Sequence, residues 1–267
     1  MNAIAAFGVG ADQRRVAAIT GGGSGLGEAT AHRLSSDGFD VAILDIDKKK
    51  AETVADRVTG QNGSALPIYV DVTNGDSVEA AFAAIEAWRK AADVLVNSAG
   101  ILRIASVVDC TLTDFKTVMD VNVTGTFLCA QRAARGMLAQ RYGRIVNLSS
   151  ISAARAGIGR IAYGTSKGAV TSMTKQLAME LGGAGITANC VAPGPVNTAM
   201  TQEYYTAETR QAFEAMIPAR RFATVSEVAH AISFLASEDA GYINGIMLPV
   251  DGGYLAAGVD STGNLHS

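Results

Sequence analysis

A tyrosine and a lysine stand four residues apart in the segment Tyr163-Gly-Thr-Ser-Lys167. On a helix, residues at this spacing share one face and lie about 6 Å apart along the axis. A nearby ammonium stabilises a phenolate, so we expect Lys167 to lower the pKa of Tyr163 towards the range of a general acid or base. Taken alone, the pair is also compatible with an ordinary amphipathic pair on a helix surface.

Ser150 lies thirteen residues before Tyr163 and follows the apolar run 144–148, which predicts a buried strand. If that strand belongs to a parallel sheet, the Ser150 hydroxyl lies at its carboxyl end. Open α/β sheets bind ligands at the carboxyl ends of their strands. The serine, the tyrosine and the lysine are therefore candidates for one catalytic site.

A glycine-rich turn follows the first apolar run, 16–20, in the order Gly21-Gly-Gly-Ser24-Gly25-Leu26-Gly27. A strand, a glycine turn and a helix N-terminus together favour an anion, because backbone N–H groups and the helix dipole both point at it. No lysine follows the turn, which argues against a nucleoside triphosphatase, and G-x-G-x-x-G does not match either. The spacing that fits is T-G-x-x-x-G-x-G, which predicts a dinucleotide site. The alternative is a plain tight turn.

Asp45 ends the second apolar run, 24 residues after Gly21. A carboxylate there would accept hydrogen bonds from ribose hydroxyls and would repel a 2′-phosphate, so we expect NAD rather than NADP. In the alternative interpretation, Asp45 and Asp47 only cap the next helix. The lysines at 48–50 could also pair with a phosphate.

Short apolar runs alternate with longer segments of helical spacing. The predicted strands are 16–20, 41–45, 66–70, 94–97, 144–148, 186–191 and 246–250. The predicted helices are 28–37, 48–58, 77–90, 112–140, 163–181 and 226–236. This alternation predicts the α/β class: a doubly wound parallel sheet (Rossmann fold) of about seven strands with helices on both faces.

We expect a single NAD-binding catalytic domain over residues 15–254, since no linker-like stretch divides the chain. Residues 196–223 form a long connection that we predict to be a lid over the site. Residues 1–14 are expected to be a loosely ordered leader and 255–267 a tail. The composition, 48% hydrophobic and 18% charged, allows a sizeable core and excludes wholesale disorder.

Charge and cysteine content narrow the expected partners. The chain has 22 basic and 25 acidic residues, a formal net charge of −3, which does not favour nucleic acid. Its three cysteines are far apart, which indicates a reducing, cytoplasmic setting. The longest uncharged stretch, 181–202, is interrupted by prolines and asparagines, so no membrane span is expected. The three histidines show no metal-ligand spacing, and no metal site is predicted.

Taken together, these motifs resemble the short-chain dehydrogenase/reductase family, and the resemblance runs from about Arg15 to Tyr254. It rests on the following residues: Thr20-Gly21-x-x-x-Gly25-x-Gly27, Asn97-Ser-Ala-Gly100, Asn122, Ser150, Tyr163-x-x-x-Lys167 and Pro193-Gly194. Each motif is weak by itself, whereas the set in this order is highly specific. One departure is Ser98, where the family usually has a second asparagine.

The resemblance implies a catalytic tetrad of Asn122, Ser150, Tyr163 and Lys167. Tyr163 would be the general acid or base, Lys167 would lower its pKa and bind the nicotinamide ribose, and Ser150 would hydrogen-bond the substrate oxygen. Asn122 would hold a proton-relay water near the lysine. The implied cofactor-binding residues are Gly21, Ser24, Gly25, Leu26, Gly27, Asp45, Asp71, Val72, Asn97, Ala99, Gly100, Tyr163, Lys167, Pro193, Gly194, Val196 and Thr198.

The predicted function is an NAD(H)-dependent interconversion of a secondary alcohol and a ketone by direct hydride transfer. The expected substrate pocket consists of Ser150, Ser152 and Tyr204, with Ile101, Leu102 and other residues of the lid beside them. Because the lid offers aromatic and small polar groups but no concentrated cationic site, a neutral substrate is expected.

Two alternatives remain open from the sequence. One is a 3-oxoacyl-thioester (acyl carrier protein) reductase; Arg141 matches one carrier-docking position, but Ala184 stands where the other arginine would be. The other is a catalytically silent dinucleotide sensor. The resemblance also implies a homotetramer built on residues 112–140 and 163–181.

Overall fold

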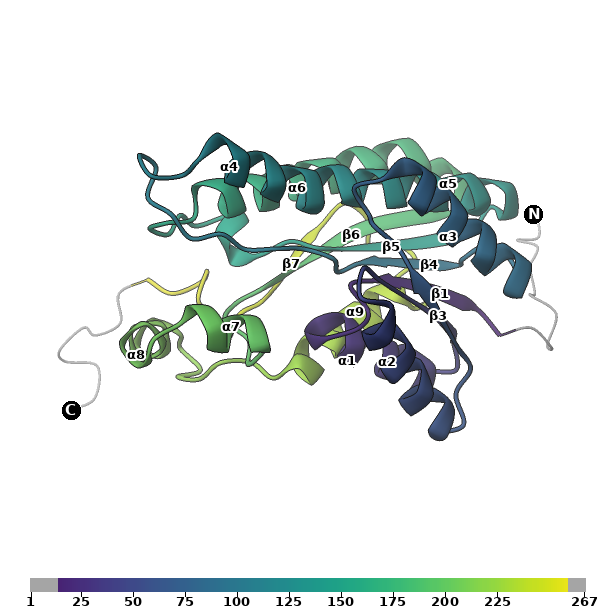
Figure 1. The fold of residues 1–267 in the computed structure, drawn as a ribbon, viewed down its shortest axis with the longest axis horizontal. Helices are drawn as coiled ribbons and strands as arrows, with labels where there is room; N and C mark the ends of the chain where they lie inside the picture. Colours follow the sequence, from purple (N-terminus) through teal and green to yellow (C-terminus); the bar gives the residue numbers. More distant parts are fainter. Residues whose placement is uncertain (1–13, 259–267) are drawn as a thin grey trace, which may run out of the picture.

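The computed structural model describes residues 14–258, and its centre is one parallel sheet of seven strands (Figure 1). The strands are β1 (Val16–Thr20), β2 (Asp40–Asp45), β3 (Ala65–Tyr69), β4 (Val94–Asn97), β5 (Gly143–Leu148), β6 (Ile186–Pro193) and β7 (Met247–Val250). Their order across the sheet is β3-β2-β1-β4-β5-β6-β7, and every neighbouring pair is parallel. The predicted fold class is confirmed.

Helices cover both faces of the sheet. On one face lie α1 (Gly25–Ser36), α2 (Lys48–Gly60) and α9 (Val225–Ala236), and on the other lie α3 (Gly75–Trp88), α4 (Leu112–Met119), α5 (Gly125–Gln140) and α6 (Ile161–Leu181) (Figure 1). Each layer has its own apolar core against the sheet. The central strands are buried along their whole length, which explains why they read as apolar runs rather than alternating ones.

The chain reverses its direction of winding at β1. It runs outward through β2 to β3 and then returns to place β4 on the other side of β1. Loops leaving the carboxyl ends of β1 and β4 therefore diverge and open a crevice, the usual binding position in open α/β sheets.

The segment predicted as one helix over 112–140 is divided by a π-helical turn, η1 (Asp120–Thr124), between α4 and α5. Such a turn inserts an extra residue into the helical ladder and often marks a functional position. Asn122 lies inside it. Hydrophobic periodicity does not reveal one extra residue in a long helix, so the sequence suggested a continuous element.

The connection after β6 contains two short helices, α7 (Ala199–Tyr204) and α8 (Ala207–Met216), which lie beyond the end of the sheet (Figure 1). Its two ends are held together, since Asn197 N donates to Ala223 O at 2.9 Å and Ala223 N donates to Pro195 O at 3.0 Å. An aromatic cluster joins it to the chain after β7: Tyr205, Phe213, Phe222 and Tyr254. Its function as a lid stays a prediction.

Of the expected leader, residues 1–13 lie outside the described residues, as does the tail from 259 onwards. Within residues 14–258, no helix combines the length and the apolar character needed to cross a membrane.

Candidate active site

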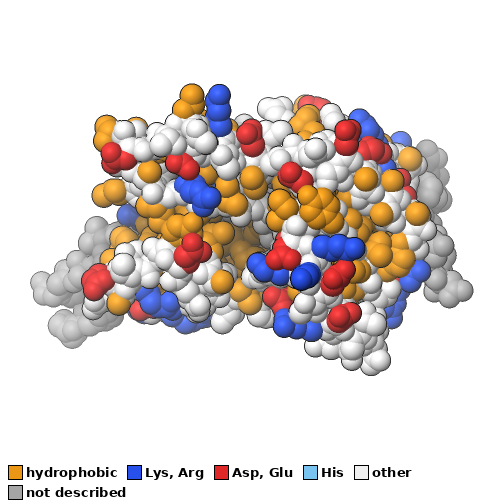
Figure 2. All heavy atoms as spheres, in the orientation of Figure 1, with side chains coloured by type: hydrophobic (Ala, Val, Ile, Leu, Met, Phe, Trp, Pro, Cys, Tyr) orange, Lys and Arg blue, Asp and Glu red, His pale blue; other side chains and the backbone are white. Residues whose placement is uncertain are grey.

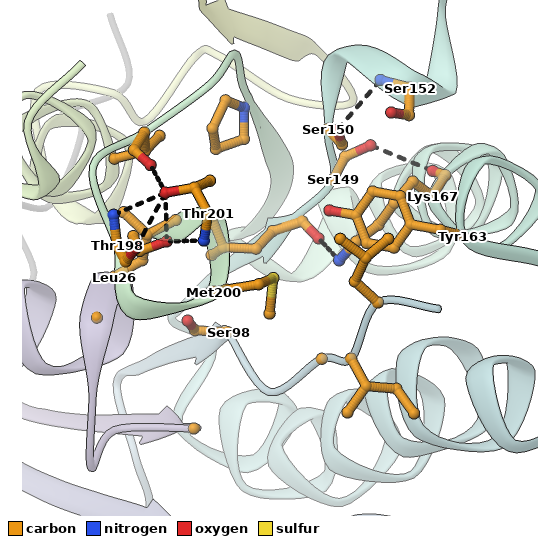
Figure 3. Close-up of a pocket in the computed structure, with 18 of the residues that line it drawn as sticks. Leu26, Ser98, Ser149, Ser150, Ser152, Tyr163, Lys167, Thr198, Met200 and Thr201 are labelled. Atoms are coloured by element: carbon orange, nitrogen blue, oxygen red, sulfur yellow. Dashed lines mark hydrogen bonds between the residues drawn. The ribbon is translucent and has the colours of Figure 1, made fainter. Parts of the chain in front are cut away.

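A cavity of about 480 Å³ lies at the carboxyl edge of the sheet. It extends from the glycine turn after β1 to the segment around Ser150 and Tyr163. Figure 2 shows hydrophobic side chains gathered in a hollow between the α7–α8 segment and the layer of α4 and α6. In Figure 3, Leu26 and Thr198 lie on one side of this opening, and Ser150, Tyr163 and Lys167 lie on the other.

The glycine turn brings backbone close to backbone. Gly21 has a φ of +63°, and a Cβ there would lie 2.8 Å from the Ala99 Cα. A Cβ on Gly27 would collide with the Gly21 carbonyl oxygen. Ser24 precedes α1 without capping it through its side chain, which leaves the first-turn N–H groups of the helix for an anion. Ser24, Gly25 and Leu26 line the cavity, whereas Gly27 packs behind the turn.

Asp45 lines the cavity and does not cap α2. Its two carboxylate oxygens accept hydrogen bonds from Gly23 N and Asp47 N, both at 2.9 Å. Asp47 is the residue that caps α2, accepting from the backbone N–H groups of Lys49 and Lys50. The two acids therefore have different roles, and the capping interpretation applies to Asp47 alone.

Two further loops complete the glycine-turn end of the cavity. Asp71 and Val72 line it after β3, and Ala99 and Gly100 line it after β4. Asn97 is placed differently from the prediction, since it is buried and its Nδ2 donates to Asn147 Oδ1 at 2.9 Å. Being held inside the sheet, Asn97 does not line the cavity.

The residues after β6 close the other side: Pro193, Gly194, Val196 and Thr198 all line the cavity. Thr198 caps α7 by accepting from Thr201 N, and Thr201 Oγ1 donates to Val196 O at 2.6 Å. A Cβ on Gly194 would lie 2.9 Å from the Asp251 Cα, so this position also needs glycine.

Ser150, Tyr163 and Lys167 meet at one end of the cavity (Figure 3). Ser150 Oγ accepts a hydrogen bond from Ser152 N at 3.1 Å, which leaves its O–H free to donate. Lys167 Nζ donates to Leu148 O at 2.7 Å and lies 5.6 Å from the centre of the Tyr163 ring. The lysine is 6% exposed, so its ammonium is almost fully removed from water.

Burial dominates the protonation of this group. It raises the pKa of Tyr163, while a hydrogen bond with Ser150 and the charge of Arg160 act in the opposite direction. It also lowers the pKa of Lys167 from 10.5 to about 8. From the sequence we expect Lys167 to lower the pKa of Tyr163. In this structure the pKa of Tyr163 is raised instead, because burial outweighs the nearby charges.

Asn122 holds the loop after β4 rather than lining the cavity. Its Oδ1 accepts from Ile101 N at 2.8 Å, and its Nδ2 donates to Ile101 O and to Ser166 Oγ, both at 3.0 Å. A Cβ on Gly100 would lie 3.2 Å from Asn122 Oδ1 and 3.6 Å from Lys167 Nζ. Asn122 therefore fixes the loop beside the lysine, and its water-holding role stays a prediction.

The expected substrate pocket needs one correction. Ser152, Ile101 and Leu102 line the cavity, but Tyr204 does not. Because α7 ends between the two tyrosines, Tyr204 turns its hydroxyl to Arg103 Nη1 at 3.3 Å, and Tyr205 lines the cavity instead.

The predicted lid supplies Met200, Thr201, Tyr205 and Phe213 to the cavity wall, but sequence reasoning missed several residues outside it: Ile46, Ser98, Ser149, Arg155, Arg160 and Tyr254. Most of them come from loops whose course no periodic pattern predicts. Arg155 and Arg160 matter most, because they place cations in a cavity for which a neutral substrate was expected.

Comparisons with known proteins agree with this geometry. A family model described as enoyl-(acyl carrier protein) reductase matches residues 21–255. The 3-oxoacyl-[acyl-carrier-protein] reductase MabA of Mycobacterium tuberculosis is 40% identical over 88% of this chain and 90% of its own. The chain belongs to the short-chain dehydrogenase/reductase family.

Two further members of this family are similar over most of their length. The 2-(R)-hydroxypropyl-CoM dehydrogenase of Xanthobacter autotrophicus is 42% identical over 91% of this chain and 99% of its own. The crystal structure of a putative gluconate dehydrogenase from Agrobacterium tumefaciens superposes with a TM-score of 0.89 at 30% identity, covering 91% of this chain and 96% of the other. This chain is accordingly an oxidoreductase acting on CH–OH groups with a nicotinamide dinucleotide.

The cavity fits such a cofactor. Gly21 packs closely against Ala99, so the glycine turn lies against the edge of the sheet. No side chain caps the first turn of α1, and Asp45 lines the cavity at the end of β2. These features would hold the pyrophosphate and a ribose, with Tyr163 and Lys167 at the far end.

The buried ammonium of Lys167 should make stability depend on pH. Between pH 8 and 10.5 the unfolded chain keeps a proton on this lysine that the folded chain has lost, so the free energy of unfolding rises with pH across this window. Relative to Lys167→Met, we expect the wild type to gain about 3 kcal/mol between the two ends. Urea denaturation of both proteins at a series of pH values measures the difference.

Lys175 is exposed on the same helix and supplies the control. Lys175→Met should keep the rise seen in the wild type. Parallel curves for the wild type and Lys167→Met would contradict the burial of a charged ammonium.

Proposed function

We propose that this chain interconverts a secondary alcohol and a ketone with NAD(H), Tyr163 acting as general acid and base. The observation that carries the proposal is the meeting of Ser150, Tyr163 and Lys167 at the end of a cavity whose other end has the glycine turn and Asp45. When bound, the nicotinamide accepts a hydride from the alcohol carbon or supplies one to the ketone.

The residues of the chain handle the proton and the oxygen. Ser150 Oγ accepts one hydrogen bond from Ser152 N and keeps its O–H, which donates to the substrate oxygen and stabilises the charge that develops there. Tyr163 Oη takes the hydroxyl proton during oxidation and returns it during reduction. Because burial raises the pKa of Tyr163, oxidation should become faster as pH rises and more phenolate forms.

Lys167 and the loops give this group its position. Lys167 Nζ donates to Leu148 O, at the end of β5, which fixes α6 against the strand that Ser150 follows. The tetrad role of Asn122 is proposed from its contact with Ile101, which holds the loop between the lysine and the substrate pocket.

Replacing the tyrosine hydroxyl tests the reaction directly. We expect Tyr163→Phe to lose turnover roughly 100- to 10,000-fold while its affinity for the dinucleotide changes little, because only the proton donor is removed. Reduced-nicotinamide absorbance measures turnover on a panel of secondary alcohols, and fluorescence titration measures binding.

Tyr242 is fully exposed, so Tyr242→Phe is the matched control and should leave both readouts unchanged. Unchanged turnover in Tyr163→Phe would refute the assignment. A wild type that binds the dinucleotide but turns over nothing would support the silent-sensor alternative.

The preference for NAD is proposed from Asp45. Its carboxylate lines the cavity and is held by Gly23 N and Asp47 N, so it cannot easily turn away from a 2′-phosphate. Lys49 and Lys50 are on the next helix, but Lys50 is already 3.8 Å from Asp47.

Asp45→Ser should therefore raise the ratio of kcat/KM with NADP to kcat/KM with NAD by at least about tenfold, because like-charge repulsion is removed. Serine keeps a short acceptor near Gly23 N. Asp47→Ser, which keeps an N-cap for α2, should leave the ratio as it is. A wild type that prefers NADP would overturn the proposal.

The second candidate, a 3-oxoacyl-thioester reductase, is favoured by the likeness to MabA. Ala184 at the carrier-docking position and Asp45 in the cavity favour the alcohol dehydrogenase function over the thioester reductase function. A comparison of an acetoacetyl thioester with NADPH against simple alcohols with NAD separates the two.

The proposed assembly is a homotetramer. Phe127 and Leu138 on α5 and Met179 on α6 are large apolar side chains that are 44%, 45% and 84% exposed, which is consistent with a partner covering these helices. Sedimentation velocity should give a species of four 27.5 kDa chains, and a clean monomer would refute it. A cytoplasmic location is proposed from the three free cysteines.

A further inference from the structure

Two arginines line the active-site cavity at its catalytic end, and neither pairs with an acid. Arg155 follows the short turn η2 (Ile151–Ala153), and Arg160 immediately precedes α6. Among residues 14–258, no carboxylate comes within 4.0 Å of either guanidinium, whereas nearby Arg103 has Asp114 at 3.9 Å. Most arginines of the described residues have an acid within 4.0 Å, so two arginines without one inside a cavity need a physical account.

Most hydrogen-bond donors of these two side chains are free. Arg160 Nη2 donates to the Tyr205 hydroxyl at 3.0 Å, and Arg155 Nη1 donates to Tyr254 O at 3.5 Å. A guanidinium carries five N–H donors in a planar fork, so each arginine keeps four donors that no described protein atom accepts.

An aromatic cluster holds both guanidinium groups. The Arg160 Cζ lies 5.4 Å from the centre of the Tyr205 ring, and the Arg155 Cζ lies 4.8 Å from that of Tyr254. Phe213 joins these two rings, since its centroid is 5.3 Å from Tyr205 and 6.1 Å from Tyr254. The two cations are thus positioned by stacking, which lowers the entropy cost of binding a ligand between free donors.

The position of Arg160 relates it to the reacting group. It precedes Tyr163 by three residues at the start of α6, roughly 4.5 Å along the helix axis. The acids that line the cavity, Asp45 and Asp71, lie at its other end. Charge is therefore separated along the cavity, with its unpaired cations beside the chemistry.

A purely structural role, in which the arginines clamp α7 and α8 over the site, would use the stacking and one donor each. It uses only one donor of the half-buried Arg160 and of the exposed Arg155, and it gives no role to the remaining donors, which are open to the cavity. Arginine forks match carboxylates and sulfonates in shape and charge. A ligand oxyanion satisfies these donors.

We propose that Arg155 and Arg160 form an oxyanion subsite of the active site, and that the substrate is a secondary alcohol or ketone carrying a carboxylate or sulfonate a few bonds from the reacting carbon. This rests on the proposed function and replaces the neutral substrate expected from the lid composition.

Matched substrates test the subsite. In the wild type, kcat/KM for 3-hydroxybutyrate should exceed kcat/KM for its methyl ester by at least about tenfold, and the ratio of the two is the readout. Arg160→Gln and Arg155→Gln should each lower that ratio by about tenfold or more. 2-Hydroxypropane-1-sulfonate, run beside the acid, distinguishes a sulfonate from a carboxylate preference. Arg103→Gln, which removes a charge outside the cavity, should leave the ratio unchanged.

A binding measurement separates this inference from the proposed reaction. Calorimetry with Tyr163→Phe and NADH should show the acid binding about tenfold more tightly than its ester, and Arg160→Gln in that background should abolish the difference. Anion binding without turnover of any substrate by the wild type would sink the reaction and keep the subsite.

Three outcomes would overturn the subsite: equal binding of acid and ester, an equal fall of kcat/KM for both substrates in the arginine variants, or a preference for the ester or an acetoacetyl thioester. The second of these is the result that a structural clamp gives.

Discussion

The close contact between the turn after β1 and the loop after β4 is the constraint on which the site depends. Thr20, at the end of β1, is buried and accepts hydrogen bonds through its Oγ1 from Ser98 N at 3.1 Å and Ala99 N at 3.2 Å. Gly21 can follow only because it has no side chain to meet Ala99. This contact sets the floor of the cavity, and it fixes where α1 begins on one side and where Gly100 passes Lys167 on the other.

At the end of the cavity near Tyr163, further hydrogen bonds connect the loop after β4 to α6 and to the end of β5. Asn122 holds Ile101, two residues beyond Ala99, and also contacts Ser166 on α6. Lys167, the next residue on that helix, returns to the carbonyl of Leu148 at the end of β5. Burial lowers the pKa of the Lys167 ammonium, whose hydrogen-bond acceptor is a carbonyl. Keeping this cation beside Tyr163 therefore lowers the stability of the folded chain. A group held at such a cost is typical of functional sites.

Much of this was predictable from the sequence, for identifiable physical reasons. The central strands could be found because parallel strands covered on both faces are continuous apolar runs. The pair Tyr163 and Lys167 could be found because helical geometry fixes their shared face. Asn97 and Tyr204 were misplaced because the direction of a side chain at a strand or helix end depends on tertiary partners, here Asn147 and Arg103. The π turn at Asn122 leaves no periodic signal.

The electrostatics of the cavity were the least visible property in the sequence. A net charge of −3 over the chain describes the average surface, and the lid composition describes only one wall. Arg155 and Arg160 come from the loop between η2 and α6, whose aromatic partners Tyr254 and Tyr205 are 99 and 45 residues further along the chain. Only the folded arrangement brings those rings together through Phe213 and sets two cations opposite the acids near the glycine turn. One cavity thus combines carboxylates at the glycine-turn end with guanidinium groups beside Tyr163, an asymmetry that neither the net charge nor the lid composition indicates.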